Sequence, residues 1–540
     1  MFDRACVGFI LCVCVAFVNN AVIKNDLYQL DIVHFNDFHD RFEETTVQFP
    51  VCKSDDDQCL GGFARLYYEI NTLLKEKQNP LLLNAGDVFQ GTYWYTLLKW
   101  EVEQNFMNML PVDASALGNH EFDDGPAGLA PYLAGLRSPV IAANLDASNE
   151  PSLDGLYKPH VVIEKKGRRI GIIGLITTET ANSSNPGNVT FLDPIETVKK
   201  EAQQLTDEGV DIIIVLSHCG LPLDIKIAKE VGENIDIIVG GHSHSLLWNG
   251  DSPSKEDISG PYPELVPTEN KPGHSVVVVT ASAFSKYLGN ITTYFDDNGD
   301  LQHFEASPIF LNRSIPEDPE IKALLKPYKA KLDGIVNEVV GTTSEDLLGP
   351  PCGARECALG DLVADALRAK AMEKVNSTLP HVAFIQRNML RGSISKGDVS
   401  RGAIINLLPF TNKVSTVELQ GKYILEALRK CLTVNWVPKP FTGPWMPQIA
   451  GMKVTLNTTD GTVGPVLVEE DDQYLPIEEE KYYQFTTMHF LIQGGNGFTM
   501  IKDNARNISN LGIDSKLMES YIREVTPITP KLDNRLTVLS

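Results

Sequence analysis

The 540-residue sequence lacks the marks of membrane and nucleic-acid-binding proteins. Beyond its N-terminus, no run approaches the ~20 consecutive apolar residues that span a bilayer. Because residues 535–540 form no hydrophobic tail, we expect neither a transmembrane anchor nor a lipid-anchor signal. Positive charge is scarce, since 47 Lys and Arg residues face 70 Asp and Glu residues, for a net charge of -23. Such a surface repels phosphate backbones, which excludes a general nucleic-acid binder and requires any polyphosphate ligand to be small and locally neutralised.

Internal repeats and low-complexity segments are also absent. Apolar residues make up 43% and charged residues 22%, a balance that excludes a wholly disordered or fibrous chain. A chain of this length exceeds one ordinary hydrophobic core. We therefore expect two domains, with three as the alternative.

The N-terminus carries the one long apolar run, residues 7–18, which follows Arg4. The run is too short to span a bilayer and is typical of a signal peptide, here residues 1–22, cut near residues 18–22. Secretion also agrees with seven Asn-X-Ser/Thr sequons, the acceptor triplets for N-glycosylation. We expect a soluble, secreted, extracellular product. The sequon residues are Asn182, Asn188, Asn290, Asn312, Asn376, Asn457 and Asn507.

Cysteine is sparse, and three of the nine cysteines lie in the predicted signal peptide. In an oxidising compartment, cysteines that are close in sequence are the expected disulfide partners. Cys219 and Cys431 have no such neighbour, and Cys219 is a candidate buried free thiol. The expected pairs are Cys52 with Cys59 and Cys352 with Cys357.

The first part of the chain, to about residue 311, alternates short apolar runs with amphipathic stretches. Buried runs of four to eight aliphatic residues bounded by Gly, Asn or Asp predict strands, and segments 60–77 and 194–208 have helical spacing. This pattern predicts a layered α/β domain, with segments 274–281 and 287–295 closing its far side. The predicted strands are 30–35, 80–84, 114–117, 140–144, 169–175, 211–217 and 235–239.

A connector helix is predicted from Pro316 to about residue 339, where apolar residues recur at helical spacing and Pro327 would kink the helix. A second α/β region follows, with helices at 359–374 and 421–432 and strands at 382–385, at 413–419 and around Met452 and Tyr482. We therefore expect a domain at 25–315, a connector at 316–340 and a second domain at 341–540.

Polar side chains follow five of the predicted strands, at the point where each strand ends. Ligands of open α/β sheets gather beyond the carboxyl ends of strands, so these side chains can converge on one crevice. One such cluster alone is typical of ordinary loop hydrogen bonding, but here the pattern repeats. Carboxylate, amide and imidazole groups without thiolate favour Zn, Mn, Mg or Ca over a structural zinc site. The side chains are Asp37, His39, Asp87, Asn119, His218, His242 and His244.

The sequence around these side chains resembles the 5'-nucleotidase family of calcineurin-like dinuclear phosphoesterases, which also includes secreted apyrases of blood-feeding arthropods. The resemblance covers nearly the whole chain after the signal peptide. It implies an α/β fold with an N-terminal four-layer domain, in which helices flank two packed sheets, and a C-terminal α/β substrate-binding domain. It rests on the motifs Asp37-Phe38-His39, Gly86-Asp87, Gly118-Asn119-His120-Glu121, His218 and Gly241-His242-Ser243-His244.

The resemblance implies two divalent metal ions, with Asp87 bridging them. Asp37, His39, Asp87 and His244 would hold one ion, and Asp87, Asn119, His218 and His242 the other. His244 departs in type, because relatives often have an amide there, and it is expected to alter metal preference.

Two metals remove the need for a Ser or Cys nucleophile. Spaced ~3.5–4 Å apart, they deprotonate a water and neutralise the phosphoryl oxygens during in-line attack. The resemblance implies that His120, oriented by Asp123, stabilises the transition state or the leaving oxygen. The three-residue spacing is compatible with one helical turn, and the alternative role for Asp123 is a helix cap.

The second domain carries the residues that resemble the family's nucleotide site. Phe410 and Phe490 match two aromatics that sandwich the base, and flat rings bind purines by stacking. A glycine-rich turn at 493–498 follows Phe490 and allows close approach of backbone to a ligand. Arg391 matches a phosphate-binding arginine, whose guanidinium can clamp a phosphate with two hydrogen bonds.

Several positions in this second domain depart from the family pattern. Gln386 stands at an Asn position before Arg391, and the glycines that follow it are replaced; Asn496 replaces an Asp that would accept from ribose hydroxyls. Gly353 stands where relatives carry Arg, which leaves Arg355 as the nearest substitute and Arg387 as a further possible contact. These changes put strict AMP geometry in doubt, but not nucleotide binding.

The sequence leaves three functions open. The favoured hypothesis is a secreted apyrase that hydrolyses ATP and ADP, and AMP as a further substrate, and so suppresses ADP-driven platelet aggregation. The alternatives are a soluble 5'-nucleotidase that converts AMP to adenosine and a non-catalytic nucleotide scavenger or platelet-receptor ligand. Nucleotides are the expected small-molecule partners; metal identity, base preference and oligomeric state stay open.

Overall fold

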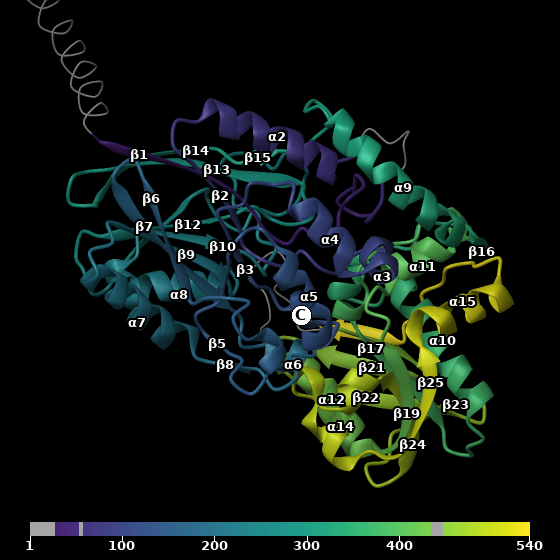
Figure 1. Cartoon of the computed structure of the whole chain (residues 1–540). Helices are drawn as coiled ribbons and strands as arrows, with labels where there is room; N and C mark the ends of the chain where they lie inside the picture. The colour runs from purple at the N-terminus through teal and green to yellow at the C-terminus, as the bar shows by residue number, and fades with distance from the viewer. Residues whose placement is uncertain (1–26, 53–57, 434–445, 540) are drawn as a thin grey trace, which may run out of the picture.

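A computed structural model describes residues 27–52, 58–433 and 446–539, so the predicted signal peptide lies outside the described residues. Within those ranges, no helix is long and apolar enough to cross a membrane. The chain folds into two α/β regions that lie against each other, with a helix along their junction (Figure 1).

Two mixed sheets form the N-terminal region. Their central strands run parallel and are buried on both faces, which explains why they read as continuous aliphatic runs. The first sheet has the order β14 (Leu301–Ala306), β13 (Tyr287–Phe295), β1 (Tyr28–Phe35), β2 (Pro80–Asn84), β3 (Ala114–Ala116) and β4 (Val140–Ile141), with β15 (Ile309–Phe310) paired to β13. The second has the order β11 (Glu264–Pro267), β12 (Ser275–Thr280), β10 (Ile237–Gly240), β9 (Ile212–His218), β7 (Arg168–Ile176) and β6 (His160–Lys165).

The two sheets pack face to face through one core of aliphatic residues, and helices cover both outer faces. The region therefore has the four layers that the resemblance implied. Helix α7 shows how sequence builds a layer: Asp193 caps it by accepting from the backbone of residues 195 and 196, and Val198, Ala202 and Leu205 recur on its buried face. The α-helices of this region are α2 (Phe63–Glu76), α3 (Tyr93–Leu98), α4 (Trp100–Met107), α5 (Gly125–Gly135), α6 (Thr180–Ser183), α7 (Pro194–Asp207) and α8 (Leu221–Val231).

Segments 274–281 and 287–295 form strands, as predicted, each in a different sheet. β12 pairs in parallel with β10, while β13 pairs antiparallel with β1 along seven residues and sits inside the first sheet. Each strand therefore extends its sheet on the side away from β4 and β6.

Helix α9 (Pro319–Val336) runs along the junction of the two regions and packs against α2 and α3 on one side and α11 (Arg401–Leu407) on the other (Figure 1). Its start lies three residues after the predicted Pro316, because Asp318 accepts from the backbone of Glu320 and Ile321 and caps the helix there. Pro327 lies inside the helix, as predicted.

The C-terminal region has its own core and two larger sheets. The first has the order β20 (Pro447–Ala450), β17 (His381–Gln386), β24 (Tyr482–Met488), β19 (Lys413–Gln420) and β25 (Arg506–Ile513); the second has the order β23 (Gln473–Pro476), β22 (Val463–Glu470), β21 (Met452–Asn457) and β26 (Leu536–Leu539). A two-stranded ribbon joins β16 (Val339–Thr343) and β18 (Gly397–Ser400). The helices are α10 (Ala358–Lys374), α11 (Arg401–Leu407), α12 (Gly421–Thr433), α13 (His489–Ile492), α14 (Thr499–Asn504) and α15 (Asp514–Val525).

Both predicted disulfides are present, Cys52–Cys59 and Cys352–Cys357. Cys219 and Cys431 are free thiols, and both are buried. The Cys352–Cys357 bridge closes the loop that contains the short helix η4 (Pro350–Gly353), which packs against η5 (Arg387–Met389) in the C-terminal region.

Candidate active site

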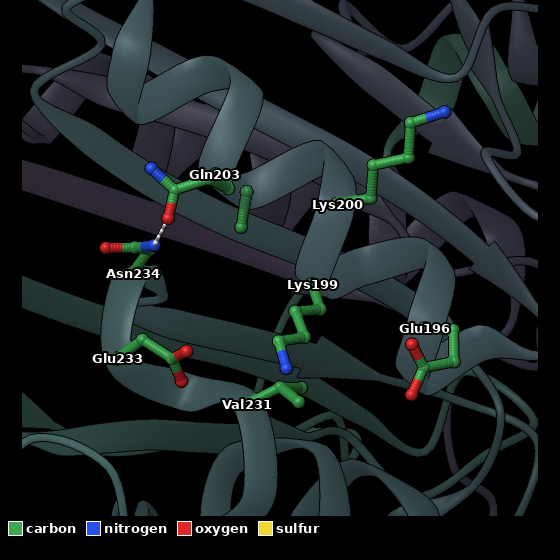
Figure 2. Close-up of a pocket in the computed structure, with 8 residues that line it drawn as sticks. Glu196, Lys199, Lys200, Gln203, Val231, Glu233 and Asn234 are labelled. Carbon is green, nitrogen blue, oxygen red and sulfur yellow. Dashed lines mark hydrogen bonds between the residues drawn. The ribbon is translucent and has the colours of Figure 1, made fainter.

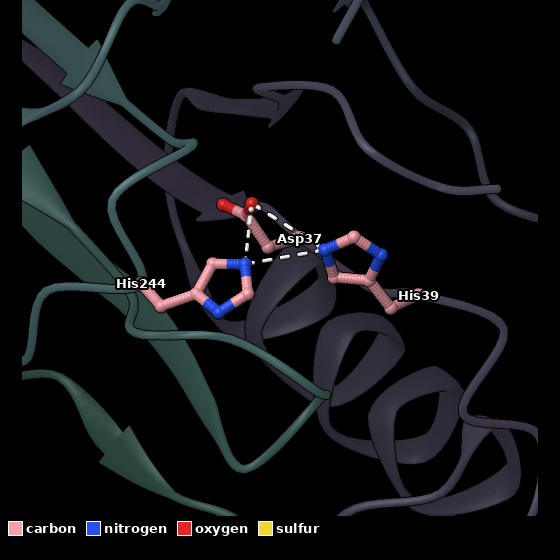
Figure 3. Close-up of side chains that lie close together, drawn as sticks. All are labelled: Asp37, His39 and His244. Atoms are coloured by element: carbon pink, nitrogen blue, oxygen red, sulfur yellow. Dashed lines mark hydrogen bonds and ion pairs between the residues drawn. The ribbon is translucent and has the colours of Figure 1, made fainter. Parts of the chain in front are cut away.

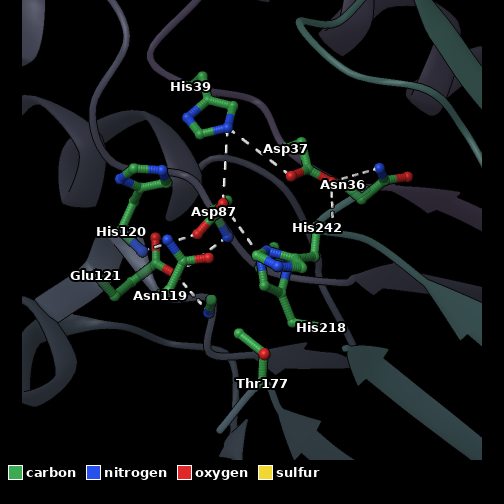
Figure 4. A network of polar contacts seen from close by, with 12 residues as sticks. Asn36, Asp37, His39, Asp87, Asn119, His120, Glu121, Thr177, His218 and His242 are labelled. Atoms are coloured by element: carbon green, nitrogen blue, oxygen red, sulfur yellow. Dashed lines mark hydrogen bonds and ion pairs between the residues drawn. The ribbon is translucent and has the colours of Figure 1, made fainter. Parts of the chain in front are cut away.

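The polar side chains predicted to converge lie together at the carboxyl ends of five strands (Figure 4). Strands β1, β2 and β3 of the first sheet and β9 and β10 of the second deliver them, so the cluster bridges the two sheets. Ligand atoms within each group lie within 4.8 Å of one another. The groups are Asp37 with His39 and His244, His39 with Asp87 and His120, and Asp87 with His218 and His242.

The first group is compact (Figure 3). The Nε2 atom of His244 lies 3.1 Å from Asp37 Oδ1 and 3.2 Å from His39 Nε2. Burial would raise the pKa of Asp37, but His244 and His218 outweigh it and lower that pKa to about 2. The carboxylate is therefore charged and faces imidazole nitrogens, as a metal ligand requires.

The second and third groups share Asp87, which also lies near His39 of the first group. Its Oδ2 lies 3.0 Å from His218 Nε2 and 3.6 Å from His39 Nε2, and its Oδ1 accepts from the backbone N–H of His120 at 2.9 Å. Asp87 thus lies between His39 and His120, from the first sheet, and His218 and His242, from the second. Its place suits the bridging role that the resemblance implied.

The remaining contacts of these residues test whether a divalent cation fits. The Nδ1 atoms of His39 and His218 lie 2.7 Å and 2.6 Å from the backbone carbonyls of Gln90 and Ala85. An Nδ1–H donated to a carbonyl leaves the Nε2 lone pair free to bind a metal. Asn119 Oδ1 is buried without a hydrogen-bond partner. Imidazole nitrogen with carboxylate and amide oxygen is a donor set for Zn, Mn, Mg or Ca, so the residues fit such an ion.

The backbone under this cluster is unusual. Asp37, His39, Asp87, His242 and His244 all have φ between 48° and 73°, in the left-handed region that non-glycine residues rarely adopt. Such positions cost of order 1–3 kcal/mol each and persist where the surrounding structure over-determines them, typically at functional sites. The strain turns each strand end sharply and aims the side chain into the site.

Glu121 is a supporting residue to which sequence reasoning gave no role. Its carboxylate accepts from the backbone N–H groups of Asp87, Val88, Phe89 and Gly118, at 2.6–3.1 Å. One side chain thus fixes the loop that carries Asp87 against the loop that carries Asn119. Its place beside His120 in the motif was the signal available in the sequence.

His120 and Asp123 form the predicted pair, because His120 Nδ1 lies 2.7 Å from Asp123 Oδ2. Burial alone would lower the pKa of His120, but the carboxylates of Asp123 and Asp87 outweigh it and raise that pKa. The other ring nitrogen, Nε2, lies 3.2 Å from the Nη2 of Arg391, which comes from the C-terminal region. The two regions therefore meet at the catalytic candidate.

Phe410, also from the C-terminal region, lies at the same junction. Its ring stacks on the His120 ring, with centroids 5.5 Å apart and planes inclined by 17°, and the Arg391 guanidinium lies 5.3 Å from its centre. Phe490 lies in the C-terminal region against Gly495, where an added Cβ would meet the ring at 2.4 Å. Gly495 therefore must lack a side chain for this turn to form.

The other predicted nucleotide contacts differ in their surroundings. Asn496 Nδ2 donates to Gln386 Oε1 at 2.8 Å, so these two residues lie side by side. The side chain of Arg355 is exposed, and an added Cβ on Gly353 would meet no atom of it within 4 Å. The space beside Gly353 belongs instead to Arg387, 3.8 Å away.

Two further residues were missed because they come from loops far apart in sequence. Arg41 is buried, donates to the carbonyl of His39 and lies 4.4 Å above the ring of Phe284. The Phe284 ring in turn contacts His39 and His244, with centroids 5.5 Å and 5.0 Å away. Phe284 is therefore an apolar wall of the first metal-ligand group.

Two other features lie apart from this edge of the sheets. A surface pocket in the outer helical layer is lined by polar side chains of α7 and of the segment after α8, including Gln203 and Asn234 (Figure 2). An acidic group in the C-terminal region, Glu356 with Asp361 and Asp533, lies against the guanidinium of Arg535, which pairs with Asp533 at 2.8 Å. The three carboxylates of the acidic group also converge, but Arg535 already lies against two of them.

Comparison with known proteins agrees with this geometry. Residues 30–246 match the calcineurin-like phosphoesterase family, and residues 339–503 match the 5'-nucleotidase C-terminal domain family. The chain is 40% identical to an apyrase of Tabanus yao over 95% of its own length and 94% of the relative's. It is 34% identical to the 5'-nucleotidase of Rattus norvegicus, over 94% and 90% of the two lengths.

A solved structure extends the likeness to the whole fold. The crystal structure of a 5'-nucleotidase precursor from Thermus thermophilus superimposes with a TM-score of 0.87 at 33% identity, covering 95% of this chain and 99% of the other. The likeness therefore spans both the N-terminal and the C-terminal region. The chain belongs to the 5'-nucleotidase family and is a metal-dependent nucleotide phosphohydrolase.

Proposed function

We propose that this chain is a secreted apyrase that removes phosphate from extracellular ATP and ADP, with AMP as a further substrate. The change at Gly353 carries the proposal: the resemblance implies an Arg at this position, and here the nearest atoms to an added Cβ belong to Arg387 at 3.8 Å. We infer that this exchange of arginines alters the AMP-specific contacts and favours substrates with more phosphates. Identity of 40% to the Tabanus yao apyrase supports the same choice.

We further propose two divalent ions, held as the resemblance implies, with Asp87 shared between the two ligand sets. Bound at this cluster, such ions supply Lewis acidity and an activated water. Protein groups do the rest: Arg391 neutralises phosphate oxygens, and His120, held by Asp123, stabilises charge on the leaving oxygen. Phe410 and Phe490 would stack on the base.

The proposal includes domains at 25–315 and 341–540 with α9 as connector, and a secreted protein with a signal peptide at 1–22. Two disulfides favour an oxidising compartment. Outside the cell, loss of ADP would suppress ADP-driven platelet aggregation.

The second candidate is a soluble 5'-nucleotidase that acts on AMP, favoured by the intact set of metal-ligand candidates, His120, Asp123 and both aromatics, and by the rat relative. Phosphate release from ATP, ADP and AMP, each with and without a chelator, separates the candidates. We expect chelator-sensitive release from all three. Release from AMP alone would contradict the apyrase proposal, and ADP binding without turnover would indicate a non-catalytic scavenger.

A further inference from the structure

Arg387 stands in a loop between the core of the C-terminal region and the catalytic candidate. It begins η5, directly after β17, and precedes Arg391 by four residues. Its side chain passes over Gly353, whose missing Cβ would lie 3.8 Å from Arg387 Cγ and Nε. Arg387 therefore packs directly beside Gly353, the position at which the resemblance implies an Arg.

The charge of Arg387 is not matched by an acid within the described part of the chain. Its Nη1 donates to the backbone carbonyl of Leu390 at 2.7 Å, and its Nε is buried without a hydrogen-bond partner. Burial and then the charge of Arg391 lower the pKa of Arg387 to about 10. Burying an unpaired cation beside a second cation costs free energy that a bound anion would offset.

Arg391 differs in this respect. Burial lowers the pKa of Arg391, but the carboxylates of Asp87, Asp123 and Asp37 act in the opposite direction and favour its charged form. Its Nη2 lies 3.2 Å from His120 Nε2. Arg391 therefore faces the metal-ligand cluster, whereas Arg387 packs beside Gly353. Gln386 Nε2, at the end of β17 and adjacent to Arg387 in sequence, is a second buried donor without a partner. Residues 386 and 387 thus offer two unmatched donors.

We propose that Arg387 is a second phosphate-binding residue, which receives the phosphate next to the one held by Arg391 and so favours nucleoside di- and triphosphates over monophosphates. The inference rests on the proposed function, because it assumes that the transferred phosphate sits between Arg391 and the metal ligands. A bound anion between the two guanidiniums removes their mutual repulsion and gives the Arg387 Nε a partner.

The test compares Arg387→Gln with Arg387→Lys and with Arg429→Gln, which removes an exposed arginine from α12. We expect Arg387→Gln to lower kcat/KM for ATP and ADP by about 10- to 100-fold and for AMP by less than about 3-fold, because it removes a charge-assisted contact to a phosphate that AMP lacks. Arg387→Lys should restore part of the loss, and Arg429→Gln should match the wild type.

Thermal unfolding of each variant shows whether Arg387 only pins the loop through Leu390. Equal losses on ATP, ADP and AMP, or a fall in Tm that accounts for them, would overturn the inference and leave the apyrase proposal intact. If the wild type hydrolyses AMP alone, the apyrase proposal fails, and ADP is then used as a competitive inhibitor of AMP hydrolysis. A rise of about 10-fold or more in the inhibition constant of ADP in Arg387→Gln supports the inference, and an unchanged constant refutes it.

Discussion

The metal-ligand cluster and the nucleotide site differ in how firmly each is built. In the cluster, five of the seven ligand candidates have left-handed backbone. Backbone groups hold the side chains of His39, His218 and Asp87, and Glu121 accepts from the backbone N–H of Asp87. In the nucleotide site, Asn496 alone among the predicted contacts has such backbone, and three of the six contacts, Arg355, Arg391 and Phe410, come from loops of the C-terminal region.

This difference assigns separate roles to the two regions. Residues held from several directions keep fixed positions, and a change in any one disturbs its neighbours. Loop residues tolerate replacement, and they set which substrate binds. The departures from the family pattern that the resemblance implies follow this division, since Gly353, Gln386 and Asn496 all lie in the C-terminal region, whereas His244 is the one such departure named in the ligand cluster.

Asp87→Asn should give the largest effect and tests the fixed side of the comparison. The amide replaces a charged oxygen that faces His218 and His39, so we expect weaker metal retention and a loss in kcat on the order of 10³-fold or more, equivalent to about 4 kcal/mol. Metal content and phosphate release from ADP measure both. Asp154→Asn, at an exposed turn, is the control. Near-wild-type activity in Asp87→Asn would contradict the proposal that both metal ions share Asp87.

Asp123→Asn should follow, with a fall in kcat of about 10²-fold or more. The carboxylate raises the pKa of His120, which keeps the imidazole protonated to higher pH. If the protonated ring stabilises the leaving oxygen, activity falls as pH rises through this raised pKa, and in Asp123→Asn that fall begins at lower pH. A pH profile of kcat measures the shift. The control is Asp124→Asn, because the Asp124 carboxylate contacts Tyr95 and Lys99, and it should keep the wild-type profile. An unchanged pH profile in Asp123→Asn would show that Asp123 does not set the protonation of His120 during catalysis.

The same division explains what the sequence could predict. Strands β2 and β13 have the predicted ends, because buried aliphatic runs bounded by polar residues mark them clearly. The seven ligand candidates were predictable because each directly follows such a strand. Edge strands β6 and β14 were not predicted, since their alternating, half-exposed residues give a weak pattern. Contacts between loops, such as Arg41 with Phe284, depend on tertiary packing that no local pattern reports.

Phe490→Ala tests the nucleotide site and should have a smaller effect than Asp87→Asn or Asp123→Asn. Loss of one stacking face costs about 1–3 kcal/mol per base, so we expect KM for ADP to rise by about 10-fold with kcat nearly unchanged. Hydrolysis of p-nitrophenyl phosphate, which has no base, should stay at the wild-type rate. An equal loss on both substrates would mean that Phe490 supports the fold around Gly495 rather than the base.

Asn496→Asp should have the smallest effect, because the nucleotide loops can adjust to it. Asn496 donates to Gln386 Oε1, and an aspartate at this position cannot. Gln386 Nε2 is buried without a partner, so a rotated amide could donate to the new carboxylate and keep the two loops joined. The carboxylate would also accept from ribose hydroxyls, and we expect KM for ADP and AMP to fall by less than about 5-fold. Kinetics on both nucleotides measure the change, with Asn504→Asp on α14 as control. A loss of activity of more than about 10-fold would show that the nucleotide loops are as tightly fixed as the metal-ligand cluster, and the distinction between the two regions would fail.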